Sequence, residues 1–325
     1  MSKLSNPRET IAIVSQYDFD FRKRFGQNFL VDEGVILRAL EAARVGKNDV
    51  IFEIGPGIGT LTQYLCEAAH SVAAIEIDRN LIPILENTLK EYENVRVINE
   101  DVLKTDLVEL AREYGAGRGT DQSEGAGAPA NLQVPQPEAG LPGTAGADES
   151  RPVSHILKIV ANLPYYITTP ILMNLFRQKV PARSITVMVQ KEVADRMTAQ
   201  PGSKDYGSLS LAVQYYSAPE IVEIVPPSSF VPRPKVTSAV VTMNLYEEPP
   251  VKPVDEELFI AVTRAAFEKR RKTLVNALGS SPAIPSGKDG IREALEKMGK
   301  SPTVRGEVLS LEEFVQLSDL LSEAG

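Results

Sequence analysis

An amide, a proline and two aromatic rings follow one another within the stretch NLPYYITTP, residues 162–170. The stretch comes after an apolar run, residues 156–161, that predicts a buried strand. The Asn162 amide and a free backbone carbonyl can accept hydrogen bonds from an exocyclic NH2 group, and a tyrosine ring can stack on the heterocycle that bears it. The other interpretation is a strand end with a proline turn and no ligand. Ligands of open α/β sheets bind beyond the carboxyl ends of the strands, which favours a binding site.

Three glycines give the strongest local indication of a cofactor. In VIFEIGPGIGTLTQYL, residues 50–65, a compact apolar strand is followed by Gly55, Gly57 and Gly59 and then by helix-forming residues. Glycine lets the backbone turn sharply and approach a ligand closely. The alternative is a glycine-rich turn that binds nothing. The spacing is GxGxG rather than the GxGxxG of dinucleotide enzymes, which favours S-adenosylmethionine over NAD.

Acidic side chains lie at or after the ends of the next two predicted strands. Glu76 lies near the end of residues 72–77, about 20 residues past the glycines, which is the usual distance for an acid that binds ribose hydroxyls. Residues 95–98 are followed by Asp101, which could meet an adenine amino group, cap the next helix, or do both. The βαβαβ order predicts an α/β fold that binds an adenosine-bearing cofactor.

The segment FRKRFGQNFL, residues 21–30, combines cations with side-chain amides. It is either an amphipathic approach to the helix predicted at residues 33–43 or a segment that places polar groups such as Asn28 over a cofactor. Phe230 stands between prolines in a later loop, where it either packs on the core or offers a stacking surface to a base. Both segments therefore have a structural and a functional interpretation.

The net charge of −8 and the pI near 5.1 by themselves disfavour nucleic acid as a partner, because phosphate contacts need Lys and Arg. Distribution matters more than the sum, and clusters of cations remain compatible with RNA. For the last cluster, a solvated helix face is the alternative to phosphate contact. The clusters are Arg22, Lys23 and Arg24; Arg233 and Lys235; and Arg270, Arg271 and Lys272.

A chain of 325 residues allows about two domains with full cores. The single cysteine, Cys66, excludes an intramolecular disulfide and indicates a reducing compartment. His70 and His155 are the only histidines and form no recognisable metal cluster with Cys66, so no metal is expected. No apolar run approaches the ~20 residues of a membrane span. We expect a soluble, cytoplasmic protein that acts as a monomer.

Two segments interrupt the α/β pattern. Residues 115–152 are rich in Gly, Ala and Pro and have few large apolar side chains, which predicts a flexible insertion. After EEPPVKP, residues 247–253, the pattern turns helical. We therefore predict a cofactor-binding domain over residues 1–248 and a helical, RNA-binding domain over residues 249–325.

Together these stretches resemble the ribosomal RNA adenine N6,N6-dimethyltransferase family, specifically its small-subunit (16S) enzymes. The resemblance covers nearly the whole chain, and it rests on the joint order of the motifs. The insertion at residues 115–152 is the one departure. The motifs are FGQNFL, EIGPGIGTLT, EID, the region of Asp101, NLPYYIT, QKEVADRM, SSFVPRPKVTSAVV and FEKRRKTLVNAL.

The resemblance implies a Rossmann-like class I methyltransferase fold, with a seven-stranded, mostly parallel sheet and a small all-α C-terminal domain. It also implies S-adenosylmethionine as the cofactor. The implied substrate is a pair of adjacent adenosines near the 3′ end of 16S rRNA, in the immature 30S subunit. The implied cofactor contacts are Asn28, Leu30, Gly55, Gly57, Glu76, Asp101 and Asn162.

The expected reaction is transfer of a methyl group to adenine N6 by in-line displacement. The Asn162 side chain and the Leu163 carbonyl would accept the two N–H groups, with Pro164 setting the turn. Tyr165 and Phe230 would hold the unstacked base between them. Positioning would then supply most of the acceleration.

Three other functions stay open at the level of sequence. The chain could methylate large-subunit rRNA and confer antibiotic resistance, could bind ribosomes or RNA without catalysis, or could be an NAD oxidoreductase. FGQNFL and RRKTLVNAL favour the small-subunit enzyme, and the intact NLPY argues against lost catalysis. The glycine spacing disfavours NAD.

Overall fold

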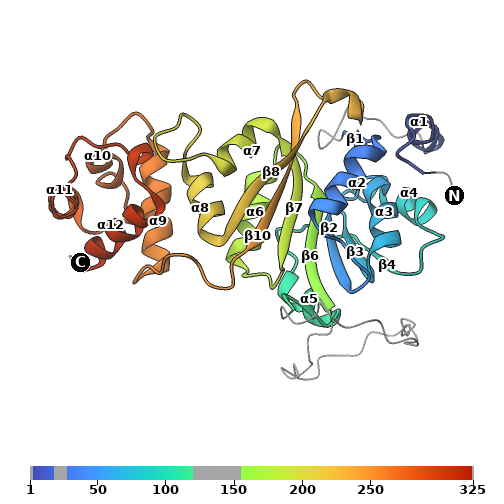
Figure 1. Cartoon of the computed structure of the whole chain (residues 1–325), viewed down its shortest axis with the longest axis horizontal. Helices are drawn as coiled ribbons and strands as arrows, with labels where there is room; N and C mark the ends of the chain where they lie inside the picture. The colour runs from blue at the N-terminus through green and yellow to red at the C-terminus, as the bar shows by residue number, and fades with distance from the viewer. Residues whose placement is uncertain (1–2, 18–27, 120–154, 324–325) are drawn as a thin grey trace.

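The computed structural model describes residues 3–17, 28–119 and 155–323. The strands of its main sheet are β2 (Asp49–Ile54), β3 (Ser71–Ile75), β4 (Val95–Ile98), β5 (Ala116–Gly117), β6 (His155–Asn162), β7 (Ser184–Gln190), β8 (Ser217–Val225) and β10 (Ser238–Leu245). They form a central sheet in the order β4-β3-β2-β6-β7-β10-β8 (Figure 1). The first five are parallel, and β10 is antiparallel to both neighbours. This is the expected seven-stranded, mostly parallel sheet, to which β5 adds a short pairing with β6.

Helices cover both faces of the sheet. Helices α2 (Glu33–Ala42) and α3 (Thr60–Ala68) pack on one face, and α5 (Leu107–Glu113) and α6 (Thr168–Arg177) pack on the other. Helix α4 (Ile82–Thr88) follows β3, while α7 (Lys191–Thr198) and α8 (Ser208–Tyr216) lie between β7 and β8 in the chain.

Strand β2 shows how this layering directs the side chains of the site. Successive residues of a strand point to opposite faces. Phe52 and Ile54 join the apolar cluster that includes α6, whereas Ile51 joins the cluster that includes α2 and α3. Glu53 therefore lies on the side of Ile51, at the end of the strand that precedes the glycine loop.

A second, two-stranded sheet joins segments that are about 200 residues apart in the chain. Strand β1 (Phe29–Leu30) pairs antiparallel with β9 (Phe230–Val231), which follows the 3-10 turn η2 (Pro227–Ser229). The first helix, α1 (Pro7–Gln16), contacts β9. The small sheet therefore brings the motifs FGQNFL and SSFVPRP to one place beside the main sheet.

Four helices make up the C-terminal part: α9 (Glu256–Glu268), α10 (Leu274–Leu278), α11 (Gly287–Lys297) and α12 (Leu311–Glu323), with the 3-10 turn η3 (Gly306–Val308) before α12. Their apolar core also contains Tyr206, Leu211 and Tyr215, which lie before or within α8. The Tyr206 hydroxyl donates a 3.0 Å hydrogen bond to the Leu309 carbonyl. The described residues from 256 onward form these helices and turns, and their apolar core extends back to α8, before the domain boundary predicted at residue 248.

Several sequence predictions differ from the structure in detail. Strand β8 was not predicted. The prediction that Asp101 caps the next helix is wrong, because Asp106 is the N-cap of α5. Residues 116–117 at the start of the predicted insertion form β5 with β6, and residues 120–154 lie outside the described residues.

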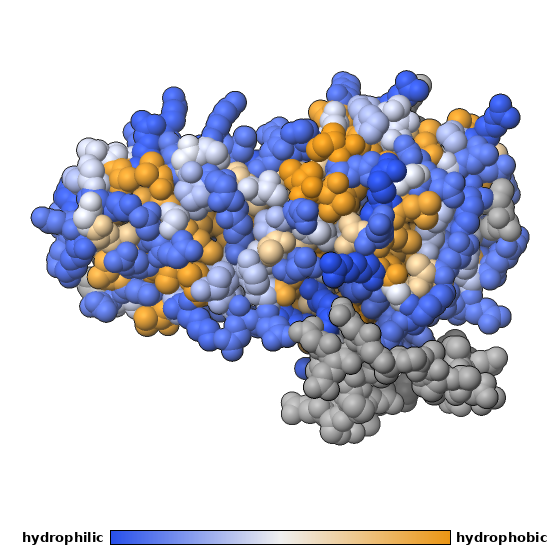
Figure 2. Space-filling model, viewed as in Figure 1, coloured by the Kyte–Doolittle hydropathy of each residue, from blue (hydrophilic) through white to orange (hydrophobic). Residues whose placement is uncertain are grey.

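The visible surface is largely hydrophilic, with an apolar patch over the region of β8 and α2 (Figure 2). Exposed apolar side chains of these two elements are Val222 and Ile224 of β8 and Leu37 of α2. Among the described helices, none is both long enough and apolar enough to cross a bilayer.

Candidate active site

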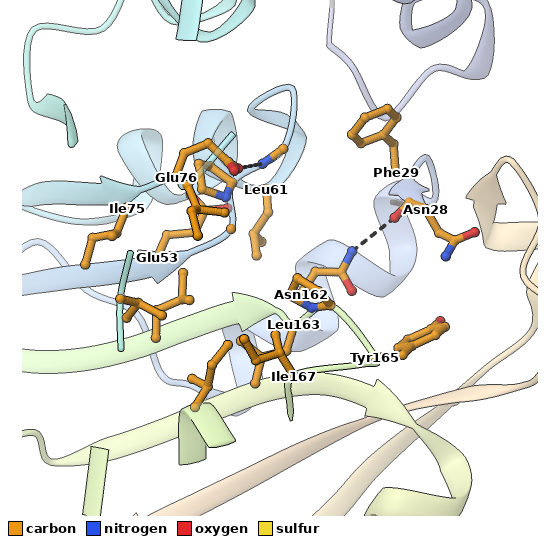
Figure 3. Close-up of a pocket in the computed structure, with 18 of the residues that line it drawn as sticks. Asn28, Phe29, Glu53, Leu61, Ile75, Glu76, Asn162, Leu163, Tyr165 and Ile167 are labelled. Carbon is orange, nitrogen blue, oxygen red and sulfur yellow. Dashed lines mark hydrogen bonds between the residues drawn. The ribbon is translucent and has the colours of Figure 1, made fainter. Parts of the chain in front are cut away.

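A pocket opens at the carboxyl ends of β2, β3 and β6 (Figure 3). Each of the three strands passes directly into a loop there, so segments distant in the chain meet around one cavity. The pocket includes every residue predicted to bind the cofactor, together with Leu163, Pro164 and Tyr165. The predicted residues that line it are Asn28, Leu30, Gly55, Gly57, Glu76, Asp101, Asn162, Leu163, Pro164 and Tyr165.

The glycine loop has a backbone conformation that other residues rarely adopt. Gly55 and Gly57 have φ values of 69° and 62°. A Cβ atom added at Gly57 would lie 3.0 Å from Cε1 of Phe29, whereas one added at Gly55 would make an ordinary 3.7 Å contact with Pro164. Glycine at position 57 thus allows both the left-handed turn and the close approach of β1.

Glu76 is a buried carboxylate tied to the glycine loop. Its Oε2 accepts a 3.3 Å hydrogen bond from the Gly57 backbone N–H (Figure 3). Its Oε1 accepts a 2.8 Å bond from the N–H of Asp78. Burial raises the pKa of Glu76 to about 7, while these backbone hydrogen bonds oppose the rise. The Asn99 amide holds the Glu76 backbone carbonyl at 2.7 Å, which fixes the end of β3.

Glu53 also lines the pocket, and the sequence analysis did not identify it. Its side chain is 1% exposed, and among the described residues its Oε2 has no hydrogen-bond partner. Burial and, to a smaller extent, the nearby Glu76 carboxylate raise the pKa of Glu53 to about 8, against the effect of the Thr62 hydroxyl. The available signal was a single acid inside an apolar strand, immediately before the glycine loop.

The charged residues among those that line the described pocket are all acidic. Asp101 accepts a 3.1 Å hydrogen bond from the Leu103 N–H, and the exposed Lys104 ammonium lies 3.9 Å from its other oxygen, outside the lining. A ligand with a net positive charge is therefore complementary to this pocket. The four acids are Glu53, Glu76, Glu100 and Asp101.

Asn162 is the last residue of β6, and one hydrogen bond orients its amide. Its Nδ2 donates to the Asn28 backbone carbonyl at 3.3 Å, which assigns the other end of the amide as an acceptor (Figure 3). The next turn is closed at Pro164, whose carbonyl accepts from the Ile167 N–H and the Thr168 hydroxyl, both at 3.2 Å. The Leu163 N–H donates to the Met188 carbonyl at 3.1 Å, which attaches the motif to β7.

Two tyrosines lie at the pocket after this turn. The Tyr165 hydroxyl shares a 2.6 Å hydrogen bond with Ser238 Oγ at the start of β10, so its half-buried ring is held in place. Tyr166 was not predicted as a site residue, but it lines the pocket and its side chain is 57% exposed.

Phe230 does not line the pocket in this structure. It is 1% exposed and packs in the apolar cluster that contains Leu30, Val35 and Val240. Of the two interpretations given for it, core packing describes its present position. A stacking role would require a conformation different from this one.

The predicted RNA-binding cations lie in three places. Arg22, Lys23 and Arg24 fall outside the described residues. Arg233 and Lys235 are exposed on the loop between β9 and β10. Arg271 and Lys272 are exposed just after α9, whereas the neighbouring Arg270 donates to the backbone carbonyls of Lys204 and Tyr206.

The chain matches known proteins over nearly its whole length. The model of the ribosomal RNA adenine dimethylase family matches residues 18–319. The chain is 48% identical over 324 residues to a ribosomal RNA small subunit methyltransferase A of Lachnoclostridium phytofermentans, with 99% of each chain covered. A protein of the same name from Alkaliphilus metalliredigens is 47% identical over 318 residues, with 98% of each covered.

A solved structure has the same fold. The crystal structure of a dimethyladenosine transferase from Plasmodium falciparum superposes with a TM-score of 0.61 at 22% identity, covering 89% of this chain and 95% of that one. The match of the family model over residues 18–319 and the two relatives at 47–48% identity show that the chain belongs to the ribosomal RNA adenine dimethylase family.

Proposed function

We propose that this enzyme uses S-adenosylmethionine to dimethylate N6 of two adjacent adenosines near the 3′ end of small-subunit rRNA. The observation that carries the proposal is the oriented Asn162 amide at the edge of a pocket whose charged lining residues are all acidic. Family membership and the small-subunit names of the relatives support the substrate. The reaction takes place in the cytoplasm, on an immature 30S subunit, with the enzyme as a monomer.

The charge of the pocket supports S-adenosylmethionine over a dinucleotide. S-adenosylmethionine carries a sulfonium and an ammonium group against one carboxylate, so its net charge is positive. A pyrophosphate would meet the four acids of the lining without a cation among the described lining residues. The buried Glu53 Oε2, which has no hydrogen-bond partner in the described part of the chain, fits the same conclusion, because a cationic ligand would supply the missing counter-charge.

The remaining pocket residues have roles that follow from their positions. Glu76 holds the ribose hydroxyls, since its carboxylate is fixed on the glycine loop beside the strand end. Asp101 meets the adenine amino group of the cofactor. Gly55 and Gly57 admit the cofactor close to the backbone, and Asn28 and Leu30 cover it from β1.

The same residues position the target amine. An aromatic amine is a poor nucleophile because its lone pair is delocalised into the ring. The Asn162 Oδ1 and the Leu163 carbonyl accept its two N–H groups, which favours a pyramidal nitrogen with its lone pair toward the methyl donor. The cofactor supplies an electrophilic methyl group when it is bound. The acceleration comes from orientation rather than from a strong base.

The base must leave its stack to reach the pocket. The ring of Tyr165, fixed through Ser238, offers one surface for it, and Phe230 would supply the other after a rearrangement. Phosphate contacts come from the exposed cations after β9 and α9. They are Arg233, Lys235, Arg271 and Lys272, with Arg270 and with Arg22, Lys23 and Arg24 in the predicted set.

One experiment distinguishes this reaction from methylation of the large subunit and from binding without catalysis. The protein is incubated with methyl-labelled S-adenosylmethionine and each ribosomal subunit purified from cells that lack this enzyme, and the labelled nucleotides are mapped. We expect label in two adjacent dimethyladenosines near the 3′ end of the small-subunit rRNA. Label in the large subunit, or none in either, would refute the proposed function.

A further inference from the structure

Glu53 is a buried carboxyl group near which the described residues place no positive charge. It lies at the end of β2, and the groups near it are the Thr62 hydroxyl and the Cys66 thiol of α3 and the Glu76 carboxyl beyond β3. None of these groups is a cation. Burying an unpaired carboxylate is costly, so such a group stays protonated until a cation reaches it.

Glu76 differs from Glu53 although both line the pocket. The Glu76 carboxylate accepts hydrogen bonds from the backbone of Gly57 and Asp78, at 3.3 and 2.8 Å, and these bonds favour its charged form. Glu53 Oε2 has no such bond among the described residues, and burial raises the pKa of Glu53 to about 8 against about 7 for Glu76. Glu53 is therefore the acid whose ionisation depends most on the ligand.

We propose that Glu53 is neutral in the unliganded protein and ionises when the positively charged part of the cofactor binds, so that cofactor binding releases a proton. This inference rests on the proposed use of S-adenosylmethionine. Glu53 is then a positioning residue that recognises the charge of the cofactor. It distinguishes S-adenosylmethionine from 5′-methylthioadenosine, which shares the adenosine and the sulfur but has neither the sulfonium nor the ammonium charge.

Proton release can be counted by isothermal titration calorimetry at pH 7 in two buffers with different ionisation enthalpies. Wild-type protein should release the larger part of one proton more with S-adenosylmethionine than with 5′-methylthioadenosine, because both ligands engage Glu76 but only one brings a cation to Glu53. Glu53→Gln should remove this difference and weaken the binding of S-adenosylmethionine by about tenfold or more. Equal proton release by wild type and Glu53→Gln would overturn the inference.

Glu100→Gln is the matched control, because it removes an exposed acid of the same pocket that bonds the Thr105 hydroxyl at 3.0 Å. Glu100→Gln should release as many protons on binding S-adenosylmethionine as wild type does. A smaller number in Glu100→Gln would mean that proton release depends on the overall charge of the pocket rather than on Glu53. Wild-type protein that binds S-adenosylmethionine without releasing a proton would refute only this inference. Failure of wild type to bind S-adenosylmethionine would refute the proposed function instead.

If Glu53→Gln binds S-adenosylmethionine too weakly for calorimetry, the inference can be tested with wild-type protein alone. The Kd ratio of 5′-methylthioadenosine to S-adenosylmethionine should rise about tenfold from pH 6 to pH 7, a range in which an α-amino group keeps its proton. Both ligands engage Glu76, so the pH dependence that Glu76 contributes cancels in this ratio. A ratio that does not change over this range would overturn the inference.

Discussion

The side chain of Asn162 connects the end of β6 to β1 through a single hydrogen bond, from Nδ2 to the Asn28 carbonyl. We expect Asn162→Ala to lower methyl transfer by about 100-fold or more, since the variant lacks an acceptor that positions the amine. The side chain is only half-buried, so the temperature of unfolding should change little. Single-turnover methylation and thermal unfolding measure the two effects.

Asn276→Ala is the control for this variant. Asn276 is exposed on α10, away from the pocket, and its amide donates to the Thr273 hydroxyl at 3.1 Å. Turnover should equal that of wild type in Asn276→Ala. If Asn162→Ala also keeps full turnover, Asn162 has no part in catalysis.

Burial of Glu53 predicts how the unliganded protein responds to pH. The folded protein keeps the Glu53 proton up to about pH 8, whereas the unfolded chain loses it near 4.5. The contribution of this group to stability is therefore complete below pH 4.5 and is lost as the pH rises toward 8. Each pKa unit corresponds to about 1.4 kcal/mol, so the loss amounts to a few kcal/mol.

Glu53→Gln should therefore flatten the fall in the free energy of unfolding between about pH 5 and pH 8. Glutamine keeps the shape of the neutral acid but has no proton to lose. Urea unfolding of both proteins without ligand, at several pH values, tests this. Parallel pH profiles for the two proteins would contradict it.

At the scale of elements, the glycine loop and β1 fit together only because residue 57 has no Cβ. In Gly57→Ala, the methyl group would meet the Phe29 ring at 3.0 Å and the residue would keep a φ of 62°. We expect the loop to shift and the Kd for S-adenosylmethionine to rise by about tenfold or more. Calorimetric titration measures the change.

The variant Gly202→Ala separates the effect of backbone strain from the effect of the contact with Phe29. Gly202 has a φ of 82° and nothing within 4 Å of an added Cβ, so alanine there meets backbone strain but no neighbour. The left-handed backbone alone should cost each variant about 1 kcal/mol of stability. Only Gly57→Ala should lose cofactor affinity, and equal affinity in the two variants would exclude the Phe29 contact as the cause.

The sequence predicted the central elements well because their strands are continuous apolar runs. β4 has the expected bounds, residues 95–98, and β6 extends the strand predicted at residues 156–161 by one residue at each end. Strand β8 was not predicted because it lies at an edge of the sheet, where Pro219, Glu220 and Glu223 interrupt the apolar pattern.

Within the pocket, the residues found from sequence lie in loops or at strand ends, where polar groups and glycines stand out. Glu53 was not predicted because it lies inside a strand, where its apolar neighbours indicate a structural rather than a functional segment. The position of Phe230 could not be predicted, because the pairing of β9 with β1 joins segments far apart in the chain. Such a contact depends on the tertiary fold rather than on local sequence.

At the scale of the molecule, an acidic chain binds RNA only if its cations gather where the RNA passes. Helix α9 ends beside the loop before α8, since Arg270 bonds the carbonyls of Lys204 and Tyr206. That loop follows α7, and α7 begins where β7 ends. The C-terminal end of α9 therefore lies toward the carboxyl ends of the strands (Figure 1). The pocket lies at the same edge of the sheet. The exposed Arg271 and Lys272 are then placed to contact RNA that reaches the pocket.

The double variant Arg271→Glu with Lys272→Glu tests this placement and leaves the hydrogen bonds of Arg270 intact. Removal of each phosphate contact should reduce the slope of log K against log salt by about 0.7 to 0.9, and affinity should fall most at low salt. Filter binding of small-subunit rRNA at four salt concentrations measures the slope. The control is Arg292→Glu with Lys297→Glu on α11, where the cations already pair with Asp289 and Glu293. The two double variants carry the same change in charge. Equal slopes in both would mean that Arg271 and Lys272 form a solvated face, and that the RNA meets the protein elsewhere.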